Sequence, residues 1–400
     1  MANVSSSNGL EKRPKLRFPG FDEPYRSTQL GNIATLVNRT DPKSNAPIMM
    51  LSAGNGFIMQ SEKYSRDNAG QSLKKYILLK QGELAYNHGA SKAKQFGCCY
   101  ELTEPEARIP YVYHCFKINS HEYTPFIAMA LNNAKMDRQL KRLVSSSVRM
   151  DGLLNISFED YMSVTIHLPS SSEQKHISDF LQKIDERIAA QEKLLTSLKK
   201  YKRGVLMHYF SDDKTQLWTQ CSISQIGKVI TGCTPPTNDR SNYDGDLLFC
   251  APGDVGEQKY ISSTEKRVSS KGFALGRPLP PNSVIVTCIG LIGKLGIAKT
   301  SMITNQQINA LVVSDGFDHE FIYYAFENFF PEYRSKVSMQ TLPILSKSEF
   351  EKLIIKVPDL DVQHKISSHL AAMDRRIEHT QQELNALIEH RRGVMQQLFI

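Results

Sequence analysis

The chain has 400 residues, of which 40% are hydrophobic and 22% are charged, and its formal net charge is +8. This composition is typical of a folded globular protein and excludes a disordered chain, while the length predicts two or three domains. No stretch approaches the roughly 20 apolar residues of a membrane-spanning helix. The polar, basic segment from Met1 to Phe21 does not resemble a signal peptide. We therefore expect a cytoplasmic protein without a membrane segment.

Charge is distributed unevenly along the chain. Residues 1–172 carry 21 Lys and Arg against 15 Asp and Glu, whereas residues 211–357 carry 15 of each. A positive excess favours a polyanionic partner, because cations that neutralise phosphates release counterions. The seven cysteines are scattered without a C-x-x-C pair. They predict buried thiols and no metal site.

Residues 1–168 form the first predicted domain. A strand-like run covers residues 34–37, and a helical patch covers residues 123–132. Glycine- and proline-containing turns separate such runs, which indicates an α/β or α+β domain.

Residues 169–212 predict one long helix. Pro169 follows a strand-like run, Ser170-x-x-Glu173 has the pattern of a capping box, and the only later glycine is Gly204. Apolar residues recur at alternating spacings of four and three, the pattern of a coiled-coil seam. The apolar seam positions are Ile177, Leu181, Ile184, Ile188, Leu195, Leu198 and Val205.

Residues 213–357 form a second domain of the same α/β type, and residues 358–400 form a second long helix. Strand-like runs cover residues 284–287 and 310–313, and a helical patch covers residues 321–330. The apolar seam positions of the last helix are Ile366, Leu370, Met373, Ile377, Leu384, Leu387 and Val394. Polar residues interrupt the two seams at matching places, Gln191 with Thr380 and Lys202 with Arg391. This match favours pairing of the two helices, although each helix could instead pack on its own domain.

An internal repeat with a period of 189 residues relates the two halves. Residues 148–210 align without a gap onto residues 337–399, with 19 identities. Upstream, residues 27–31 resemble residues 223–227, and residues 83–89 resemble residues 284–290. Repeats of this kind organise a whole fold. We expect two similar domains joined by two constant helices that form a coiled coil, with an internal pseudo-two-fold repeat.

Motifs of catalysis are missing from the sequence. Neither Pro-Pro pair, at Pro235 and at Pro280, has the Asn/Asp-Pro-Pro-aromatic context in which a DNA methyltransferase holds a flipped base. Gly293-Lys294 lacks the first glycine and the hydroxyl residue of a phosphate-binding loop. A protein with two differing domains, a helical spacer and no catalytic motif is expected to be a non-catalytic binding protein.

The layout resembles the specificity subunits of type I restriction–modification systems. The matching motifs are Arg17-Phe18-Pro19-Gly20-Phe21, Leu-Gly or Ile-Gly at the start of each domain, Thr304-Asn305-Gln306, and Pro169-x-x-x-Glu173-Gln174. Two features depart from the family pattern. Val362 replaces the glutamate in the second copy, and Tyr25 stands where Trp218 fills a common tryptophan position.

This resemblance implies an antiparallel coiled coil that carries two target-recognition domains, each reading half of a split DNA sequence. It also implies two methyltransferase subunits and two restriction subunits as partners in a bacterial or archaeal cytoplasm. S-adenosylmethionine, Mg²⁺ and ATP would be bound by those partners, so this chain is expected to hold no cofactor and no metal.

Residues with bidentate reach or positive charge are the candidates for DNA contact, because such side chains read bases and neutralise phosphates. In the first domain they are Asn87, His88, Ser91, Lys92, Lys94, Lys141, Arg142 and Arg149. In the second domain they are Lys294, Lys299, Asn305, Gln306, Gln307 and Gln340.

A flank beside the first seam, Phe180, Leu194 and Tyr201, is apolar where its counterparts are polar. We expect it to pack on a methyltransferase subunit or on the first domain. The alternative function is a coiled-coil adaptor that presents two protein-binding domains. A methyltransferase or nuclease in its own right is disfavoured by the missing motifs.

Overall fold

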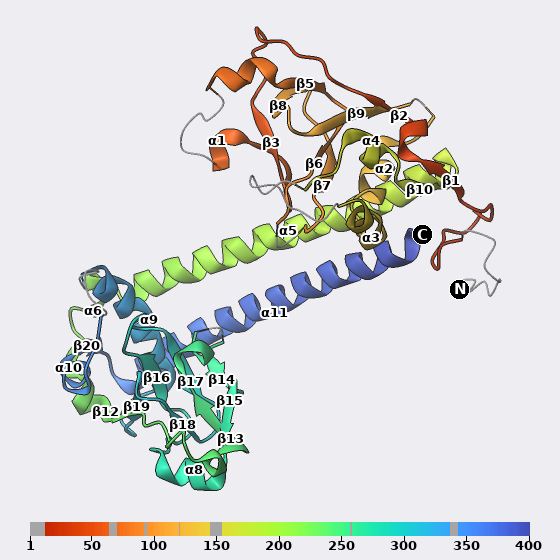
Figure 1. Cartoon of the computed structure of the whole chain (residues 1–400). Helices are drawn as coiled ribbons and strands as arrows, with labels where there is room; N and C mark the ends of the chain where they lie inside the picture. The colour runs from red at the N-terminus through yellow and green to blue at the C-terminus, as the bar shows by residue number, and fades with distance from the viewer. Residues whose placement is uncertain are drawn as a thin grey trace. The chain divides into compact units, whose positions relative to one another are not determined.

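The computed structural model describes residues 13–63, 70–91, 94–119, 121–144, 154–256, 258–336 and 343–400. These residues divide into two compact units. Unit 1 comprises Met1–Gln191 and Glu383–Ile400, and unit 2 comprises Glu192–Gln382. Each unit therefore combines one α/β domain, which we call a head, with a part of both long helices (Figure 1).

Helices α5 (Ser171–Tyr209) and α11 (Leu360–Leu398) each contain 39 residues. All fourteen apolar seam positions are buried or half-buried along them. In unit 1, Arg391 Nη2 donates to Asp185 Oδ2 at 2.8 Å and Gln191 donates to Glu383 at 2.8 Å. Residue numbers rise along one helix as they fall along the other, so the helices are antiparallel, as predicted. In unit 2, the Lys202–Asp374 pair at 2.7 Å and the Tyr209–His369 hydrogen bond at 2.7 Å show the same direction.

The first head is built on a four-stranded sheet with the order β2-β9-β6-β7. A second layer pairs β3 with β4 and β5 with β8, and a parallel bridge from Ile48 to Arg108 joins these two pairs. The strands are β1 Arg26–Gln29, β2 Ala34–Leu36, β3 Met49–Ser52, β4 Gly56–Met59, β5 Ile77–Lys80, β6 Leu84–Asn87, β7 Cys98–Glu101, β8 Glu106–Ile109, β9 His114–Ile118 and β10 Thr165–Leu168. The helices are α1 Gln60–Lys63, α2 Thr124–Ala130, α3 Ala134–Leu143 and α4 Phe158–Met162.

The second head repeats the order of the four strands of the main sheet, adds a fifth strand to it, and has a differently connected second layer. Its main sheet has the order β12-β19-β16-β17-β14, and its second layer has the order β15-β13-β18. The strands are β11 Thr219–Ser222, β12 Gly227–Thr231, β13 Tyr243–Cys250, β14 Tyr260–Ile261, β15 Lys266–Val268, β16 Val284–Thr287, β17 Leu295–Ala298, β18 Met302–Thr304, β19 Ile308–Val313 and β20 Ile354–Val357. The helices are α6 Asp212–Thr215, α7 Ile223–Ile226, α8 Ser270–Leu275, α9 His319–Lys336 and α10 Lys347–Lys352.

Equivalent backbone hydrogen bonds align the two heads and correct one expected match. The Leu30 N–H donates to the Val164 carbonyl, and the Ile223 N–H donates to the Leu353 carbonyl, both at 3.0 Å. Val164 and Leu353 are related by the 189-residue period. Leu30 therefore corresponds to Ile223, and the expected match of Leu30 with Ile226 was wrong by three residues.

The strand ladders correct a second match. Leu36 and Leu84 both pair with Phe116 on β9, and Val229 and Val284 both pair with Leu311 on β19. Leu84 thus corresponds to Val284, one residue away from the expected alignment. A shift of one residue matters because it moves every side chain of a strand to the opposite face.

Each head is completed by the C-terminal end of a long helix. The Phe399 ring, beyond α11, stacks on Phe126 of α2 at 5.2 Å, and the Phe210 ring, beyond α5, lies 5.6 Å from Phe321 of α9. Phe210 and Phe399 are equivalent in the repeat. These contacts join the helix ends to the main cores of the heads, where burial of aromatic rings contributes much of the packing energy.

The start of each long helix is attached to its head by an equivalent glutamine. Gln174 is fully buried; its Oε1 accepts from the Tyr123 N–H at 2.9 Å and its Nε2 donates to the Pro169 carbonyl at 3.0 Å. Gln363 makes the same two bonds, with the Asp318 N–H at 2.9 Å and the Pro358 carbonyl at 2.8 Å. Both glutamines therefore hold a helix start against the first turn of α2 or α9.

Glu173 is only partly the capping residue that the sequence predicts. The Ser170 Oγ accepts from the Glu173 N–H at 3.3 Å, as in a capping box. Its carboxylate, however, is fully buried and accepts two hydrogen bonds from Arg17, at 2.9 and 2.8 Å. The side-chain hydrogen bond to Glu173 raises the pKa of Arg17. Val362 occupies this position in unit 2.

Candidate nucleic-acid interface

The loop after β6 in the first head holds four of the predicted DNA-contact residues within the described chain. Asn87 Oδ1 accepts from the Gly89 N–H at 2.9 Å, and the Lys94 N–H donates to Ser91 Oγ at 3.0 Å. The Lys94 ammonium donates to the Asn132 carbonyl at 3.1 Å. These bonds hold the described parts of the loop on either side of residues 92 and 93, and Ser91 is exposed.

Gly97 closes this loop and permits no side chain. Its φ is +83°, and a Cβ there would lie 2.4 Å from the Asn87 carbonyl oxygen. His88 is only 5% exposed, and its ring centre lies 6.2 Å from that of Tyr86 and 4.9 Å from that of His114. Of the described DNA-contact candidates in this loop, His88 is therefore the least accessible. Lys92 lies outside the described residues.

Lys141 and Arg142 are exposed in the last turn of α3. Arg149 and Gln340 lie outside the described residues. In the second head, Lys294 is half-buried beside Gly256 at the start of β17, and Lys299 is exposed with its ammonium 5.1 Å from the Tyr260 ring centre.

Asn305, Gln306 and Gln307 form the turn between β18 and β19. Asn305 Nδ2 donates to Gln307 Oε1 at 3.1 Å, and Asn305 Oδ1 accepts from the Gln307 N–H at 3.1 Å. The exposed Gln306 accepts from Thr234 Oγ at 2.5 Å. The amides therefore orient one another, so that Gln306 is the most accessible of the three.

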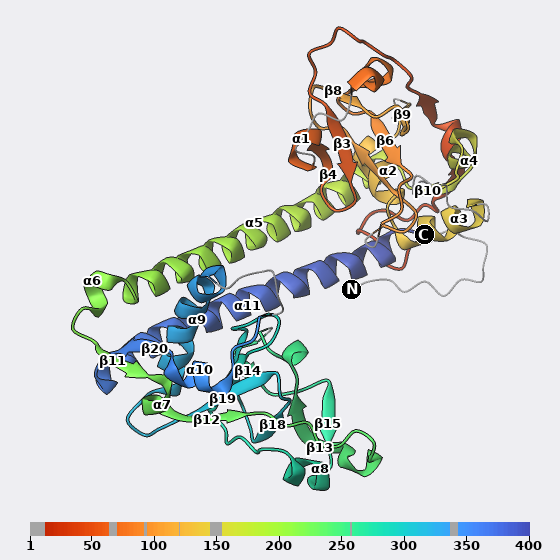
Figure 2. The ribbon, with the colours of Figure 1, turned by 60° about the vertical axis from the view of Figure 1, so that its left-hand side comes forward.

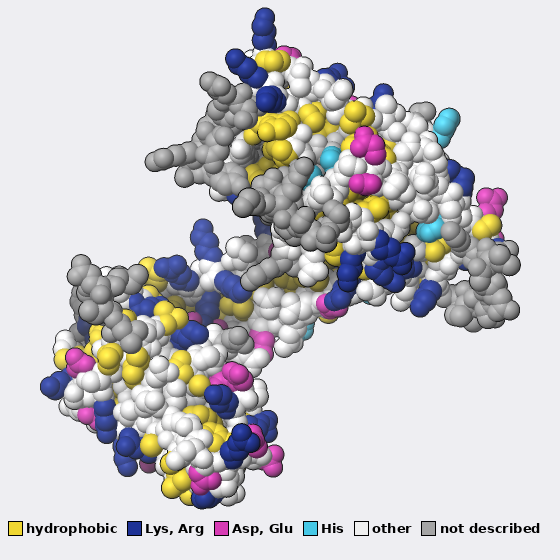
Figure 3. Space-filling view, in the orientation of Figure 1, with side chains coloured by type: hydrophobic (Ala, Val, Ile, Leu, Met, Phe, Trp, Pro, Cys, Tyr) yellow, Lys and Arg dark blue, Asp and Glu magenta, His cyan; other side chains and the backbone are white. Residues whose placement is uncertain are grey.

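A basic groove that the sequence did not predict lies in unit 1, between the start of α3 and the last turns of α11. Its volume is about 710 Å³, and among the described residues six Lys and Arg side chains line it with a single carboxylate, Asp137. The cations are Lys15, Lys94, Lys135, Arg138, Arg391 and Arg392. Among them only Lys94 was a candidate, because the groove joins segments that are far apart in the sequence. Figure 3 shows Lys and Arg side chains gathered on this face of unit 1.

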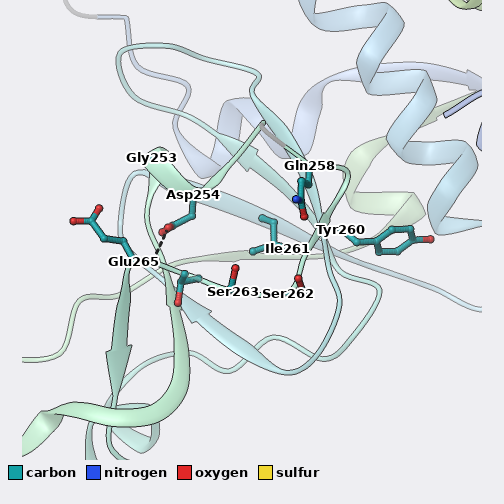
Figure 4. Close-up of a pocket in the computed structure, with 9 residues that line it drawn as sticks. Gly253, Asp254, Gln258, Tyr260, Ile261, Ser262, Ser263 and Glu265 are labelled. Atoms are coloured by element: carbon teal, nitrogen blue, oxygen red, sulfur yellow. Dashed lines mark hydrogen bonds between the residues drawn. The ribbon is translucent and has the colours of Figure 1, made fainter. Parts of the chain in front are cut away.

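The hollows of unit 2 have a different chemistry. One of about 310 Å³ is lined by hydroxyl and acidic residues, including Asp254, Ser262, Ser263 and Glu265 (Figure 4). Asp254 Oδ1 accepts from the Glu265 N–H at 2.8 Å, so this carboxylate shapes the loop itself. Another hollow, of about 580 Å³, contains Lys299 and Arg375 together with Asp318 and Glu320. Neither presents a predominantly basic wall.

The apolar flank of α5 is divided between two environments. The Phe180 ring packs edge-on against Phe18 of the first head, with ring centres 5.5 Å apart. Leu194 and Tyr201 are 42% and 62% exposed. The contact of Phe180 is thus made within unit 1, whereas the other two residues present apolar surface on α5.

Within the described ranges, no group of three or more His, Cys, Asp or Glu residues is placed to hold a metal ion. Five of the seven cysteines are buried thiols, and Cys221 and Cys233 are partly buried. Burial raises the pKa of Cys98 to about 11, which makes it a poor nucleophile at neutral pH. Among the described residues, no helix is both long and apolar enough to span a membrane.

Comparison with known proteins identifies the family. Residues 55–200 and 216–390 match the family described as the type I restriction modification DNA specificity domain, and the chain belongs to this family. The specificity subunit of type I restriction enzyme MjaIX from Methanocaldococcus jannaschii is 30% identical over 178 residues, which cover 43% of this chain and 41% of that relative. The HindI specificity subunit from Haemophilus influenzae is 30% identical over 108 residues, or 26% of this chain and 24% of the relative. The matched stretches thus span less than half of each relative.

Solved structures support the same fold. The crystal structure of the S subunit of a type I restriction–modification system from M. genitalium superposes with a TM-score of 0.61 at 14% identity, covering 97% of this chain and 99% of that one. A chain from a study of complex assembly and conformational transition of the type I R-M system gives a TM-score of 0.59 at 15% identity, covering 94% and 97%. The two-headed architecture is therefore shared over almost the whole chain.

Proposed function

We propose that this chain is the DNA-specificity subunit of a type I restriction–modification complex and that each head reads one half of a bipartite target. The observation that carries the proposal is the repeated construction: two heads whose main sheets share the order of four equivalent strands, each combined with parts of both long helices. Membership of the DNA specificity family supports it.

The heads differ where they present loops, which fits two different half-sites. In the first head the loop after β6 begins with Asn87, whereas in the second head Thr287 stands at the equivalent position. Thr287 Oγ accepts from the Lys294 N–H at 3.0 Å and so closes a shorter hairpin. Direct base readout depends on such side chains and their reach, so the two loops would select different bases.

The partners are part of the same proposal. Double-stranded DNA would contact the heads, while two methyltransferase subunits would dock on the helices, joined by two restriction subunits. Adenine methylation and ATP-dependent cleavage would occur in those partners, which would bind S-adenosylmethionine, Mg²⁺ and ATP. Such a complex acts on chromosomal DNA in the cytoplasm of a bacterium or archaeon.

A methylome tests the proposal. The chain would be expressed with the methyltransferase subunit encoded beside its gene, and N6-methyladenine would be mapped across the host chromosome. We expect a split motif that is methylated on both strands and is lost when this chain is omitted. A stable complex that methylates no motif would contradict the specificity role. Failure to form any complex would favour the alternative, an adaptor with two protein-binding heads.

The seam of α5 and α11 would set the gap between the half-sites. A heptad adds about 10 Å to a helix, since each residue rises about 1.5 Å. Insertion of seven residues after both Leu195 and Leu384 is therefore expected to lengthen the methylated spacer. An unchanged spacer in a folded, active complex would show that helix length does not measure the gap.

The exposed pair Leu194 and Tyr201 would dock a methyltransferase subunit. Their replacement by Glu introduces charge into an apolar contact, so copurification of that subunit should fall. The matched control is Glu at Lys199 and Lys200, which are exposed on the same helix. Full copurification of the methyltransferase subunit with the Leu194 and Tyr201 variant would show that these residues are not its docking surface.

A further inference from the structure

The basic groove of unit 1 concentrates positive charge on facing elements. Lys135 and Arg138 are three residues apart in α3, which places them on one face of that helix. Arg391 and Arg392 approach from α11, and Lys15 approaches from the N-terminal segment. Figures 1 and 2 both show α3 beside the C-terminal end of α11.

The charge of the groove is only partly neutralised by this chain. Arg391 is paired with Asp185, Arg392 lies 3.7 Å from Glu389 across an exposed ion pair, and the Lys135 ammonium donates to the Phe399 carbonyl at 2.7 Å. Burial lowers the pKa of Lys135, and the charges of Arg138 and Lys15 lower it further. Lys15, Arg138 and Arg392 are exposed to solvent. The groove is therefore a place where an anion would relieve repulsion between cations.

At the equivalent position in unit 2, two carboxylates neutralise the positive charge. The repeat makes Lys202 the counterpart of Arg391. Its ammonium binds both carboxylate oxygens of Glu327, at 2.9 Å each, and Asp374 at 2.7 Å. Glu327 corresponds to Asn132, because Gln174 and Gln363 contact equivalent points of α2 and α9, Tyr123 and Asp318. A carboxylate in unit 2 thus stands where unit 1 has an amide and an open groove.

We propose that this groove binds the sugar–phosphate backbone of duplex DNA beside the half-site that the first head reads. The inference rests on the proposed function and adds a contact surface to it. A duplex presents one phosphate per strand for about every 3.4 Å of its axis, so a groove with several cations can contact more than one phosphate. Lys94 belongs both to the groove and to the loop after β6, which makes the two surfaces continuous.

The phosphate backbone of DNA fits the groove better than an acidic segment of a partner protein. Lys94 joins the groove to the loop after β6, the loop proposed to read bases. The apolar residues proposed to dock a methyltransferase subunit, Leu194 and Tyr201, belong instead to unit 2.

The test uses the triple variant Lys15→Gln, Arg138→Gln and Arg392→Gln in the full chain, bound to its methyltransferase subunit. The control is Lys43→Gln, Lys74→Gln and Lys117→Gln, three exposed lysines of the first head outside the groove. Duplex affinity would be measured against salt concentration, with circular dichroism and melting temperature to establish that both variants fold. Each phosphate contact contributes about 0.9 to the slope of log affinity against log salt. We expect the groove variant to lose about 2 to 3 units of slope, the control to lose less than about 1 unit, and the methylated motif to stay the same.

Equal slopes for the two variants would overturn the proposal. Loss of the methyltransferase subunit from the groove variant alone would also overturn it, by assigning the groove to a protein partner. The unmodified complex separates failure of the proposed function from failure of the groove proposal. If this complex neither methylates a motif nor binds duplex DNA, the proposed function fails. If it does both while the groove variant behaves like the control, only the groove proposal fails.

Discussion

The two units share the order of four strands in their main sheets but differ in how charge is arranged where the head meets the long helices. In unit 1, Arg17 and Glu173 form a buried pair at the start of α5, and an open basic groove lies beside α11. In unit 2, Val362 replaces the buried carboxylate, and Lys202 is held between Glu327 and Asp374. The repeat therefore preserves how each long helix packs on its head, whereas the charged residues at that contact differ between the two units.

The largest effect is expected from breaking the buried pair of unit 1. Glu173→Ala leaves the Arg17 guanidinium, whose side chain is 14% exposed, without its carboxylate partner. Removal of one member of a buried pair costs about 3 to 5 kcal/mol. Val362→Ala at the equivalent, partly exposed position should cost about 1 kcal/mol or less. Denaturant unfolding measures both values, and similar losses at the two sites would contradict this difference between the units.

The second comparison concerns the polar seam positions. Burial lowers the pKa of Lys202, but Glu327 and Asp374 raise it more, so the charged ammonium is stabilised. Lys202→Met should cost about 2 to 4 kcal/mol because it leaves two partly buried carboxylates together. Arg391→Met removes a more exposed pair and should cost about 1 kcal/mol or less. Chemical denaturation measures the free energy of unfolding of both variants. A greater loss of stability for Arg391→Met than for Lys202→Met would contradict this prediction.

A third, smaller effect concerns acid stability. Burial lowers the pKa of His114, whose ring nitrogen lies 2.9 Å from the Ile156 carbonyl oxygen. Because the unfolded chain takes up this proton first, stability should fall as the pH drops below about 6.5. His114→Gln removes that contribution, so the variant should lose less stability than the parent between about pH 6.5 and 5. Melting temperatures of the parent and the variant across this pH range test the prediction. If the melting temperature depends on pH in the same way for both proteins, His114 does not contribute to the loss of stability in acid. His319 supplies the matching test in unit 2, because burial lowers its pKa as well.

The smallest effect sharpens the groove proposal. Asp137 is the one carboxylate that lines the groove in the part of the chain that the structure describes, and burial raises its pKa. Asp137→Asn removes repulsion of phosphate, so duplex affinity should rise about twofold to fivefold at low salt, the range of one partly exposed charge interaction. The control is Glu159→Gln, which removes an exposed carboxylate on α4 of the same head. An equal rise in both variants would show only the effect of net charge.

Much of the fold could be predicted from the sequence because the helices repeat with an unbroken register. The heptad spacing and the 189-residue period predicted both long helices, and β10 and β20 are related by that same period. The heads were harder to align, since turns of different length separate their short strands. This is why the match of Glu83 with Val284 missed by one residue and the match of Leu30 with Ile226 by three.

The candidate interface was predictable only where it lies in one continuous segment. The loop from Asn87 to Lys94 and the amides at Asn305 to Gln307 follow strand ends that a pattern of turns can indicate. The groove is different, because it depends on α3 and α11 lying side by side. Arg17 and Glu173, which are 156 residues apart, likewise form a pair that no local pattern contains. The groove and the Arg17–Glu173 pair could therefore be recognised only after the tertiary contacts were known.

Unit 1 is formed by two separate stretches of the chain, which affects how it folds during synthesis. Unit 2 is a continuous stretch of chain, whereas unit 1 needs residues 383–400 to cover Phe126 and to receive the Lys135 ammonium, 264 residues after it. Chains emerge from the ribosome in order, and domains fold as their residues become available. The head that is synthesised first is therefore the one completed last, and the apolar surface around Phe126 stays uncovered until translation reaches residues 383–400.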